Sequence, residues 1–292
     1  MLSILIPTYN YNAYTLVKEL HNQLRDLKIL FEIICIDDGS KSELNKFNLE
    51  INSLSHSTFI LLEDNIGRSA VRNLLSEKAK YKWLLFLDSD VYPKKSNFIN
   101  EYLDIIKRSE YAIISGGISY KIDNSKKLLR WKLGKNNEEK SVFIRSRNSY
   151  KYFFTANFLI KKSIMELINF NEDLIKYGYE DLLFSKSIKN KSIKIKQVNN
   201  SVFHLGIDSN ETFLNKTKSA LENLSYLIQT NQLSINDVRI YSIYNKLKKY
   251  KISGLFLIFI DHFQRYSIKK SSLFYYNLFR IAFLDNISKN SK

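Results

Sequence analysis

Two carboxylates two residues apart, Asp88 and Asp90, follow the apolar run Trp83–Leu87. Carboxylate oxygens suit a hard divalent cation such as Mg²⁺ or Mn²⁺, which often completes its coordination shell with substrate phosphates. An Asp-x-Asp pair also arises by chance, and the alternative is a helix N-cap beside a turn residue. Its place directly after a run that reads as a buried strand favours the cation site.

Polar residues also follow three other apolar runs within the first 116 residues. Helical patterns separate these runs, as the spacing of Leu16, Leu20 and Leu24 indicates. Short apolar strands alternating with helices predict an α/β fold with a parallel sheet covered on both faces. The carboxyl ends of such strands form one rim, where ligands bind, although Asp and Asn are also ordinary turn residues. The three polar clusters are Pro7-Thr8-Tyr9 after Leu2–Ile6, Asp37-Asp38 after Phe31–Ile36, and Asp64-Asn65 after Phe59–Leu62.

The turn after the first predicted strand, Pro7-Thr8-Tyr9-Asn10, contains no glycine. Dinucleotide-binding sheets need glycines at this turn so that a pyrophosphate can approach the backbone. A phosphate-binding loop ending in Gly-Lys-Ser or Gly-Lys-Thr is also missing from the sequence. The sequence therefore argues against both of these kinds of nucleotide binding.

The composition is that of a globular protein of 292 residues, with 45% hydrophobic and 14% aromatic residues. The aromatic content argues against a disordered chain. The single cysteine, Cys35, rules out a disulfide framework and any cysteine-cluster metal site, and it reads as inert core. No secretory signal is visible, and no run of about 18 apolar residues predicts a membrane span.

The net charge of +16 is concentrated near the C-terminus. Residues 238–292 contain 11 Lys and Arg against two Asp, a net +9, although a composition rich in Lys, Asn and Ile also fits an A/T-rich genome. A basic helix with an apolar stripe either lies in a membrane interface or packs on the predicted α/β part of the chain or a second subunit, and we favour the membrane. The predicted single stripe consists of Ile252, Leu255, Phe256, Phe259, Ile260 and Phe263.

Five short motifs occur in a recognisable order along residues 1–206: Ser3-Ile4-Leu5-Ile6-Pro7-Thr8-Tyr9-Asn10, Ile36-Asp37-Asp38-Gly39-Ser40, Asn65-Ile66-Gly67 with Arg72-Asn73, Leu87-Asp88-Ser89-Asp90, and Gly178-Tyr179-Glu180-Asp181. Each motif is weak alone, but a chance match of all five in order is very improbable. Through this ordered set the chain resembles the family 2 glycosyltransferases of the GT-A fold, which are inverting, metal-dependent and use nucleotide sugars.

The resemblance implies a nucleotide site built from the first four motifs. A carboxylate of Asp37 or Asp38 would accept a hydrogen bond from the uracil N–H, and the resemblance does not decide between the two. Arg72 is expected near the diphosphate, with a solvated helix residue as the alternative. The other residues implied along the nucleotide are Pro7, Thr8, Tyr9, Asn65, Gly67 and Asp88.

The resemblance also implies a general base in the acidic pair Glu180-Asp181, usually its aspartate, Asp181. An acceptor hydroxyl must lose its proton as it attacks the anomeric carbon, from the face opposite the departing nucleoside diphosphate. One base is enough, because a metal offsets the charge that builds on the leaving group. The alternative is a helix N-cap, and the two roles can coexist.

The metal implied by the resemblance is Mn²⁺ or Mg²⁺, and the donor substrate is a nucleoside diphosphate sugar, UDP-linked. Asp90 would ligate the metal, and Asp88 would face either the ribose or the metal. His204, in the segment Val202-Phe203-His204-Leu205-Gly206, is similar to a metal-ligating histidine of some GT-A enzymes. The alternative for His204 is a side chain packed against the sheet.

The expected architecture is a GT-A catalytic domain over residues 1–210, followed by a helical, basic-aromatic extension over residues 211–292. Within the catalytic domain, residues 1–116 would form the nucleotide-binding half and residues 117–210 the acceptor-side half. Residues 118–150 read as an irregular excursion, and Lys194–Val202 as an edge strand.

The expected activity is transfer of a sugar to a hydroxyl of a glycan or lipid-linked glycan in polysaccharide biosynthesis. The alternatives are a sugar nucleotidyltransferase, which usually carries a Gly-rich turn after the first strand, and a catalytically degenerate sugar-binding module. Arg145 and Arg147 would meet an anionic acceptor or be surface charges. An anionic membrane surface is an expected partner and nucleic acid is not, while a homo-oligomer stays open. The expected location is cytoplasmic, with peripheral attachment to the inner face of the cell membrane left open.

Overall fold

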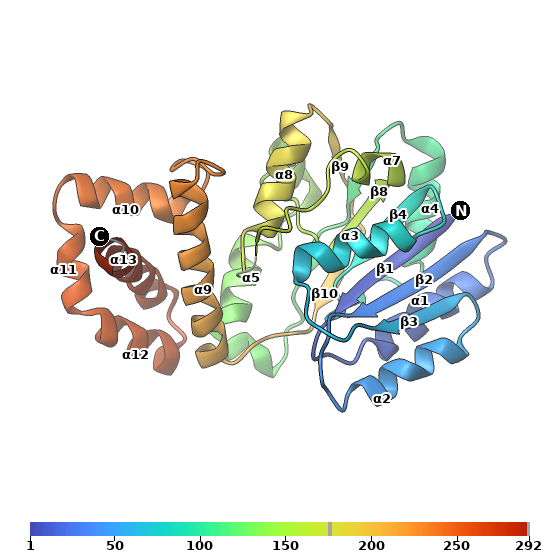
Figure 1. The fold of residues 1–292 in the computed structure, drawn as a ribbon, viewed down its shortest axis with the longest axis horizontal. Coiled ribbons are helices and arrows are strands. Elements are labelled where there is room, and N and C mark those ends of the chain that lie inside the picture. Colours follow the sequence, from blue (N-terminus) through green and yellow to red (C-terminus); the bar gives the residue numbers. More distant parts are fainter. Residues whose placement is uncertain (175–176, 291–292) are drawn as a thin grey trace. The chain divides into compact units, whose positions relative to one another are not determined.

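A computed structural model describes residues 1–174 and 177–290, which are drawn in colour in Figure 1. Contacts between Cα atoms divide the chain into two compact units. The first, here called the sheet unit, comprises residues 1–121, 138–173 and 180–206, and the second, the helical unit, comprises residues 122–137, 174–179 and 207–292. The two units are defined by their contacts, which do not show whether either unit folds independently. The domain boundary predicted at residue 210 therefore stays a prediction.

A seven-stranded sheet in the order β3-β2-β1-β4-β8-β6-β9 forms the centre of the sheet unit. Neighbours among β1 to β4 run parallel, and β8 is antiparallel to both β4 and β6. The predicted α/β fold with a mostly parallel sheet is therefore confirmed. The strands are β1 (Leu2–Thr8), β2 (Phe31–Asp37), β3 (Ser57–Leu61), β4 (Trp83–Leu87), β6 (Ile113–Ser115), β8 (Asn157–Lys161) and β9 (Ile195–Gln197).

Helices with one apolar face cover this sheet (Figure 1). Leu16, Leu20 and Leu24 are all buried, which confirms the amphipathic pattern that the sequence predicts for the first helix. Leu5 and Phe86 of the sheet share one core with side chains of α3 and α8. The helices of this unit are α1 (Tyr14–Arg25), α2 (Asn45–Asn48), the 3-10 helix η1 (Leu49–Ser53), α3 (Arg68–Lys78), α4 (Phe98–Arg108), α6 (Val142–Arg147), α7 (Lys162–Met165) and α8 (Glu180–Asn190).

A second, three-stranded sheet corrects two sequence predictions. Its order is β5-β10-β7, from β5 (Val91–Pro93), β10 (Val202–His204) and β7 (Ile118–Ser119). Lys194–Val202 is therefore not one edge strand, because β9 joins the large sheet and β10 joins the small one. The segment 118–150, predicted to be irregular, contains β7, η2 (Asn124–Lys127), α5 (Leu129–Asn137) and α6. Their short lengths leave too few turns for a period to be visible in the sequence.

The carboxyl ends of the first three strands lie level with one another. Thr8 pairs with Asp37, and Asp37 pairs with Leu61. The Asp38 N–H donates to the Thr8 carbonyl at 2.9 Å. Beyond β2 the chain turns at Gly39, whose φ is +70°. A Cβ at this position would clash with the backbone of Asp64, which passes close by. This close approach brings the second and third polar clusters of the sequence to one rim of the sheet.

Arg145 on α6 is a structural residue and not a surface charge or a free acceptor-binding group. Its side chain is buried, and burial lowers the pKa of its guanidinium. Three backbone carbonyls near β6 and β9 accept from its terminal nitrogens, those of Ser115 at 3.3 Å, Gly116 at 3.2 Å and Val198 at 2.6 Å. The guanidinium thus joins the ends of two strands that are far apart in the sequence.

Replacing Arg145 by Met should lower the free energy of unfolding by about 3 kcal/mol or more, because each buried carbonyl left unpaired costs about 1–3 kcal/mol. Arg147→Met is the matched control, since Arg147 is exposed above the Phe143 ring, and it should change the stability by less than about 0.5 kcal/mol. Urea denaturation measures both changes in the free energy of unfolding, with the same dependence on urea concentration expected for both variants. Equal stability of the two variants would contradict the structural role.

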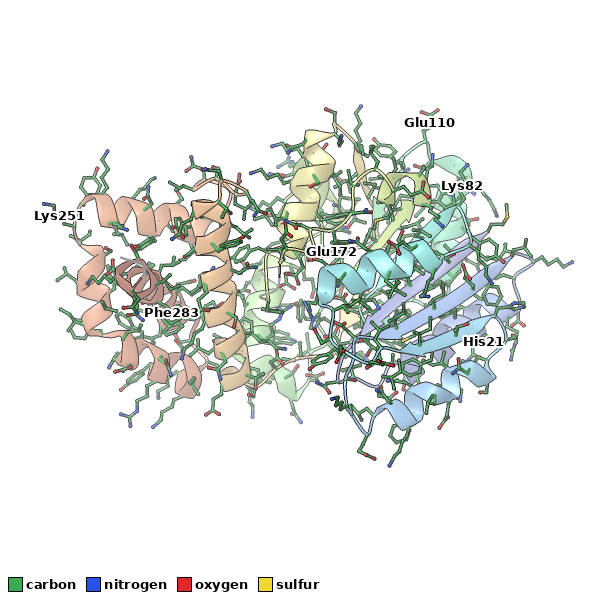
Figure 2. All side chains as sticks on the ribbon, viewed as in Figure 1. His21, Lys82, Glu110, Glu172, Lys251 and Phe283 are labelled. Atoms are coloured by element: carbon green, nitrogen blue, oxygen red, sulfur yellow. The ribbon has the colours of Figure 1, made fainter. Side chains whose placement is uncertain are left out.

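The helical unit is arranged around α13 (Leu273–Asn290), which Figure 1 shows nearly end on. It contacts α9 (Asn210–Gln229), α10 (Arg239–Lys249), α11 (Ser253–Ile258) and α12 (Ile260–Lys270), and α5 as well. Figure 2 shows Phe283 of α13 among these helices and Lys251 at the corner between α10 and α11. Among the described residues, no helix is long and apolar enough to cross a membrane.

The apolar stripe predicted as one surface over residues 252–263 is divided in the structure. The helix breaks at Phe259, so that α11 and α12 are separate helices. Phe263 belongs to the core that also holds Tyr276 and Phe279 of α13, whereas Leu255 and Phe259 are exposed. The prediction of a single stripe was therefore wrong, because it assumed an unbroken helix.

Candidate active site

Asp37 and Asp38 at the end of β2 are both buried and both hold the rim together. The Asp37 carboxylate accepts from the Ser40 N–H at 2.7 Å and from the Ser40 hydroxyl at 2.5 Å. The Asp38 carboxylate accepts from the N–H groups of Ile66 at 2.8 Å and Gly67 at 3.1 Å. Burial raises the pKa of Asp38, although these two N–H groups act in the opposite direction. Asp38 therefore ties the loop after β2 to the loop that begins α3.

The remaining residues predicted along the nucleotide flank this junction. Pro7 and Thr8 end β1, and the Thr8 hydroxyl donates to the Tyr11 carbonyl at 3.2 Å. Tyr9 is the first residue beyond the strand and is exposed. The Asn65 amide donates to the Asp38 carbonyl at 3.0 Å. The structure thus brings the first three motifs together at one edge of the sheet.

Two arginines one helical turn apart on α3 pair with two acids of the rim. Arg72 is buried, and its Nη2 donates to Asp88 Oδ1 at 2.6 Å. Arg68 Nη1 donates to Glu180 Oε1 at 3.0 Å. Burial by itself would raise the pKa of Asp88, but the charges of Arg72 and Arg68 outweigh it and lower that pKa. Asp88 is therefore an anion at neutral pH.

Sequence reasoning missed Arg68, although its spacing of four residues from Arg72 places both side chains on one helix face. It also expected Arg72 beside the diphosphate, whereas the structure places its Nη2 on Asp88. The Nε of Arg72 is buried and has no hydrogen-bond partner in the described part of the chain. This guanidinium keeps one donor available for a further acceptor.

Asp181, in the first turn of α8, is held by Thr155. The Thr155 hydroxyl donates to Asp181 Oδ1 at 2.6 Å, and the Thr155 N–H donates to Oδ2 at 3.3 Å. Burial, and next the charge of Glu180, raise the pKa of Asp181 to about 6, with Asp88 adding to the rise. The charge of Arg72 and the Thr155 hydroxyl act against the rise. A carboxylate with such a pKa can accept a proton near neutral pH.

Asp90 and His204 are neighbours across the small sheet. Their Oδ2 and Nε2 atoms are 3.6 Å apart, and the Leu205 N–H donates to the Asp90 carbonyl at 2.8 Å. A Cβ at Gly206 would overlap the Asp90 carboxylate, so a glycine is needed at that position. The His204 ring stacks on Tyr120 with centroids 5.8 Å apart. Its Nδ1 is buried without a hydrogen-bond partner among the described residues.

These contacts reduce the predicted protein ligands of the metal from three to two. Two ligands side by side on an octahedral Mg²⁺ lie about 3 Å apart, so the Asp90–His204 pair fits a divalent cation after a small adjustment. The predicted third ligand, Asp88, is held by Arg72 instead. Among the residues that the structure describes, no group of three His, Cys, Asp or Glu side chains could hold a metal ion. Further oxygens, such as those of a diphosphate, would have to complete the shell.

The mostly parallel sheet with acids and arginines at its carboxyl rim fits the expected GT-A fold. The family model described as glycosyl transferase family 2 matches residues 3–171, and the chain belongs to this family. The family resemblance stated from the motifs is therefore confirmed.

Curated relatives carry glycosyltransferase names. The chain is 33% identical over 127 residues to chondroitin synthase of Escherichia coli, covering 43% of the chain and 18% of that protein. It is 27% identical to dolichyl-phosphate beta-glucosyltransferase of Dictyostelium discoideum, covering 42% of the chain and 41% of that protein. An uncharacterized glycosyltransferase of Haemophilus influenzae is 26% identical over 267 residues, which is 86% of the chain and 98% of that protein. The chain thus spans less than half of the first two relatives.

Solved structures of S. aureus TarS share the fold. TarS 1–349 superposes with a TM-score of 0.51 at 17% identity, covering all of this chain and 92% of that one. A second TarS structure is a complex with UDP-GlcNAc, and its TM-score is also 0.51.

The contact between Thr155 and Asp181 gives a prediction that requires no substrate. Thr155→Val removes a hydroxyl that stabilises the ionised carboxylate, so the pKa of Asp181 should rise above about 6. Thr155→Ser keeps the hydroxyl and should leave the pKa unchanged. Titration of the ¹³C-labelled aspartate carboxyl resonances measures both values. An unchanged pKa in the valine variant would contradict the role assigned to this hydrogen bond.

Proposed function

We propose that this chain is an inverting glycosyltransferase that moves a sugar from a UDP-linked donor to a hydroxyl of a glycan or lipid-linked glycan in polysaccharide biosynthesis. The observation that carries the proposal is the arrangement of acidic and basic side chains at the rim of the sheet, in a chain that belongs to glycosyl transferase family 2. Two acids, Asp88 and Glu180, are paired with arginines, while Asp181 has a raised pKa and hydrogen bonds from Thr155.

Asp181 is the proposed general base. The acceptor hydroxyl passes its proton to the Asp181 carboxylate while its oxygen forms a bond to the anomeric carbon. The bond between that carbon and the diphosphate oxygen breaks on the opposite face, and the electron pair leaves with the nucleoside diphosphate. Configuration inverts, and one carboxylate suffices for the proton balance. Burial and the charge of Glu180 raise the pKa of Asp181 and so bring it closer to neutral pH, as suits a general base.

The donor is proposed to lie along the rim formed by β1, β2 and the start of α3. TarS, which shares the fold, has been solved with UDP-GlcNAc and with UDP, and this supports a UDP-linked donor. The base contact is proposed for one of the two carboxylates at the end of β2, Asp37 or Asp38, both of which are buried at the rim. Pro7, Thr8, Tyr9, Asn65 and Gly67 stay the proposed flanking residues.

Arg72 and Arg68 are proposed to stabilise the diphosphate. Arg72 has a buried Nε without a hydrogen-bond partner among the described residues, and Arg68 lies one turn away on the same face. A donor diphosphate brings about two negative charges, which two guanidinium groups can offset. Asp88 would then keep Arg72 in place and face the ribose.

A divalent cation, Mn²⁺ or Mg²⁺, is proposed between Asp90, His204 and the diphosphate oxygens. When bound, it would supply positive charge that stabilises the leaving group. The need for a glycine at position 206 supports this assignment, since it leaves the Asp90 carboxylate next to His204.

The acceptor and the location are proposed from relatives and from charge. Chondroitin synthase of Escherichia coli and the poly(ribitol-phosphate) beta-N-acetylglucosaminyltransferase TarS carry names of polymer-building enzymes. An anionic membrane surface on the cytoplasmic side stays a proposed partner of the helical unit, which would serve a lipid-linked acceptor. A sugar nucleotidyltransferase is less favoured, because the loop between β1 and α1 contains no glycine.

Asp181→Asn should lower the rate of sugar transfer by about 10²- to 10⁴-fold, the usual contribution of a general base.

Burial and Glu180 raise the folded-state pKa of Asp181 from 3.8 to about 6, so the native protein holds this proton more tightly than the unfolded chain does. Stability is therefore lost as pH rises from 3.8 to about 6. At pH 7 the asparagine variant should thus unfold at no lower temperature than the original protein.

The pH dependence provides the control for this variant. Transfer by the original protein should fall as the pH drops below about 6, because Asp181 then carries a proton. Asp104→Asn, a change at an exposed acid on α4, should alter neither the rate nor this profile. Full transfer by Asp181→Asn at pH 7 would remove Asp181 as the base.

Calorimetric titration with UDP tests the donor and the metal together. UDP should bind in the presence of Mn²⁺, and the affinity should fall at least tenfold when the metal is chelated. Asp90→Asn should reduce this metal dependence. Equal affinity with and without metal would contradict the role of Asp90, and failure to bind UDP at all would contradict the donor.

A further inference from the structure

Five apolar side chains are exposed within ten residues, from the corner where α10 meets α11 to the end of α11. Their exposed fractions lie between 40% and 72%. We call this set the corner patch. It consists of Tyr250, Ile252, Leu255, Ile258 and Phe259.

Two side chains of the corner patch, Leu255 and Ile258, face away from the centre of the helical unit. Helix α11 attaches to α13 through its other face, where the Ser253 hydroxyl donates to Asp285 Oδ1 at 2.6 Å. In a helix with 100° per residue, Leu255 and Ile258 point in nearly the opposite direction from Ser253. Packing within this unit therefore leaves these two side chains without a covering helix.

Lysines lie at the N-terminal side of the corner patch, and the nearby sequence contains few acids. Lys246, Lys248, Lys249 and Lys251 precede it and are exposed. Asp261 is the single acidic residue of the sequence between positions 238 and 284. An exposed apolar set thus adjoins a positively charged segment, which is the pattern that an anionic lipid surface attracts.

We propose that the corner patch is a membrane-binding surface that inserts Leu255, Ile258 and Phe259 among the acyl chains of an anionic membrane, while the lysines contact the phosphates of the headgroups. A second copy of the chain fits less well, because a two-fold contact through this patch would place the lysines of both copies together. A nucleic acid would contact the lysines but gain nothing from exposed aliphatic side chains. The proposal does not depend on the donor chemistry.

Lys251 allows a charge to be removed without harm to the fold. It ends α10 in the left-handed region with a φ of 60°, where glycine is favoured over any L side chain. Lys251→Gly therefore relieves strain while it removes one positive charge from the corner. Weaker lipid binding by this variant would not reflect unfolding.

Vesicle flotation with the full chain tests the proposal, using phosphatidylcholine vesicles with and without phosphatidylglycerol. The chain should bind the anionic vesicles at least tenfold more tightly than the neutral ones. The double variant L255S and I258S should bind them at least tenfold more weakly, and Lys251→Gly about fivefold more weakly. Leu49→Ser is the matched control, because Leu49 is 55% exposed in the sheet unit, and it should bind as the original does.

Equal binding to neutral and anionic vesicles, or unchanged binding by the double variant, would overturn the proposal. Sedimentation velocity of the protein alone provides a second decisive outcome. If the double variant converted a dimer to a monomer, the patch would be an interface between two copies instead. Calorimetry with UDP on each variant keeps this result separate from the donor proposal, because the corner patch should not affect nucleotide affinity.

Discussion

The ion pair between Arg72 and Asp88 is the contact on which the charge balance of the rim depends. It joins α3 to the end of β4 and places a buried guanidinium near two acids, Asp88 and Asp181. Arg68 pairs with Glu180, so two acids of the rim have a cation and Asp181 receives hydrogen bonds from Thr155 instead. An isolated buried carboxylate prefers its protonated form, whereas a paired one remains ionised. The rim therefore contains acids of two kinds, ionised carboxylates paired with arginines and one carboxylate whose pKa is raised.

Sheet geometry made much of this rim predictable. Parallel strands with a shared register end at one edge, so polar residues after four apolar runs had to meet there. The pairing of Thr8 with Asp37 and of Asp37 with Leu61 confirms that prediction for the first three runs. The ordered set of five motifs indicated the family, and the family model that matches residues 3–171 confirms it.

The partners of individual side chains were not predictable in the same way. Whether Arg72 meets a ligand or Asp88 depends on distances of a few ångströms between α3 and β4, which no periodicity encodes. Thr155 is separated from Asp181 by 26 residues, and no sequence spacing links them. Arg145 reads as a surface charge because it stands in a polar segment, yet the carbonyls at the ends of β6 and β9 make its burial favourable. The break at Phe259 was missed because a helical period continues across it.

The central claim is that the carboxyl rim of the sheet binds one nucleotide, and amide NMR tests it most directly. When UDP and Mg²⁺ are added to ¹⁵N-labelled protein, the resonances of Thr8, Ile66, Gly67 and Asp90 should shift together with one saturating affinity. Those of Ser3, Glu32 and Lys80, which are linked by hydrogen bonds away from the rim, should stay in place. Shifts confined to this second group, or no saturable shift at the rim, would contradict the account.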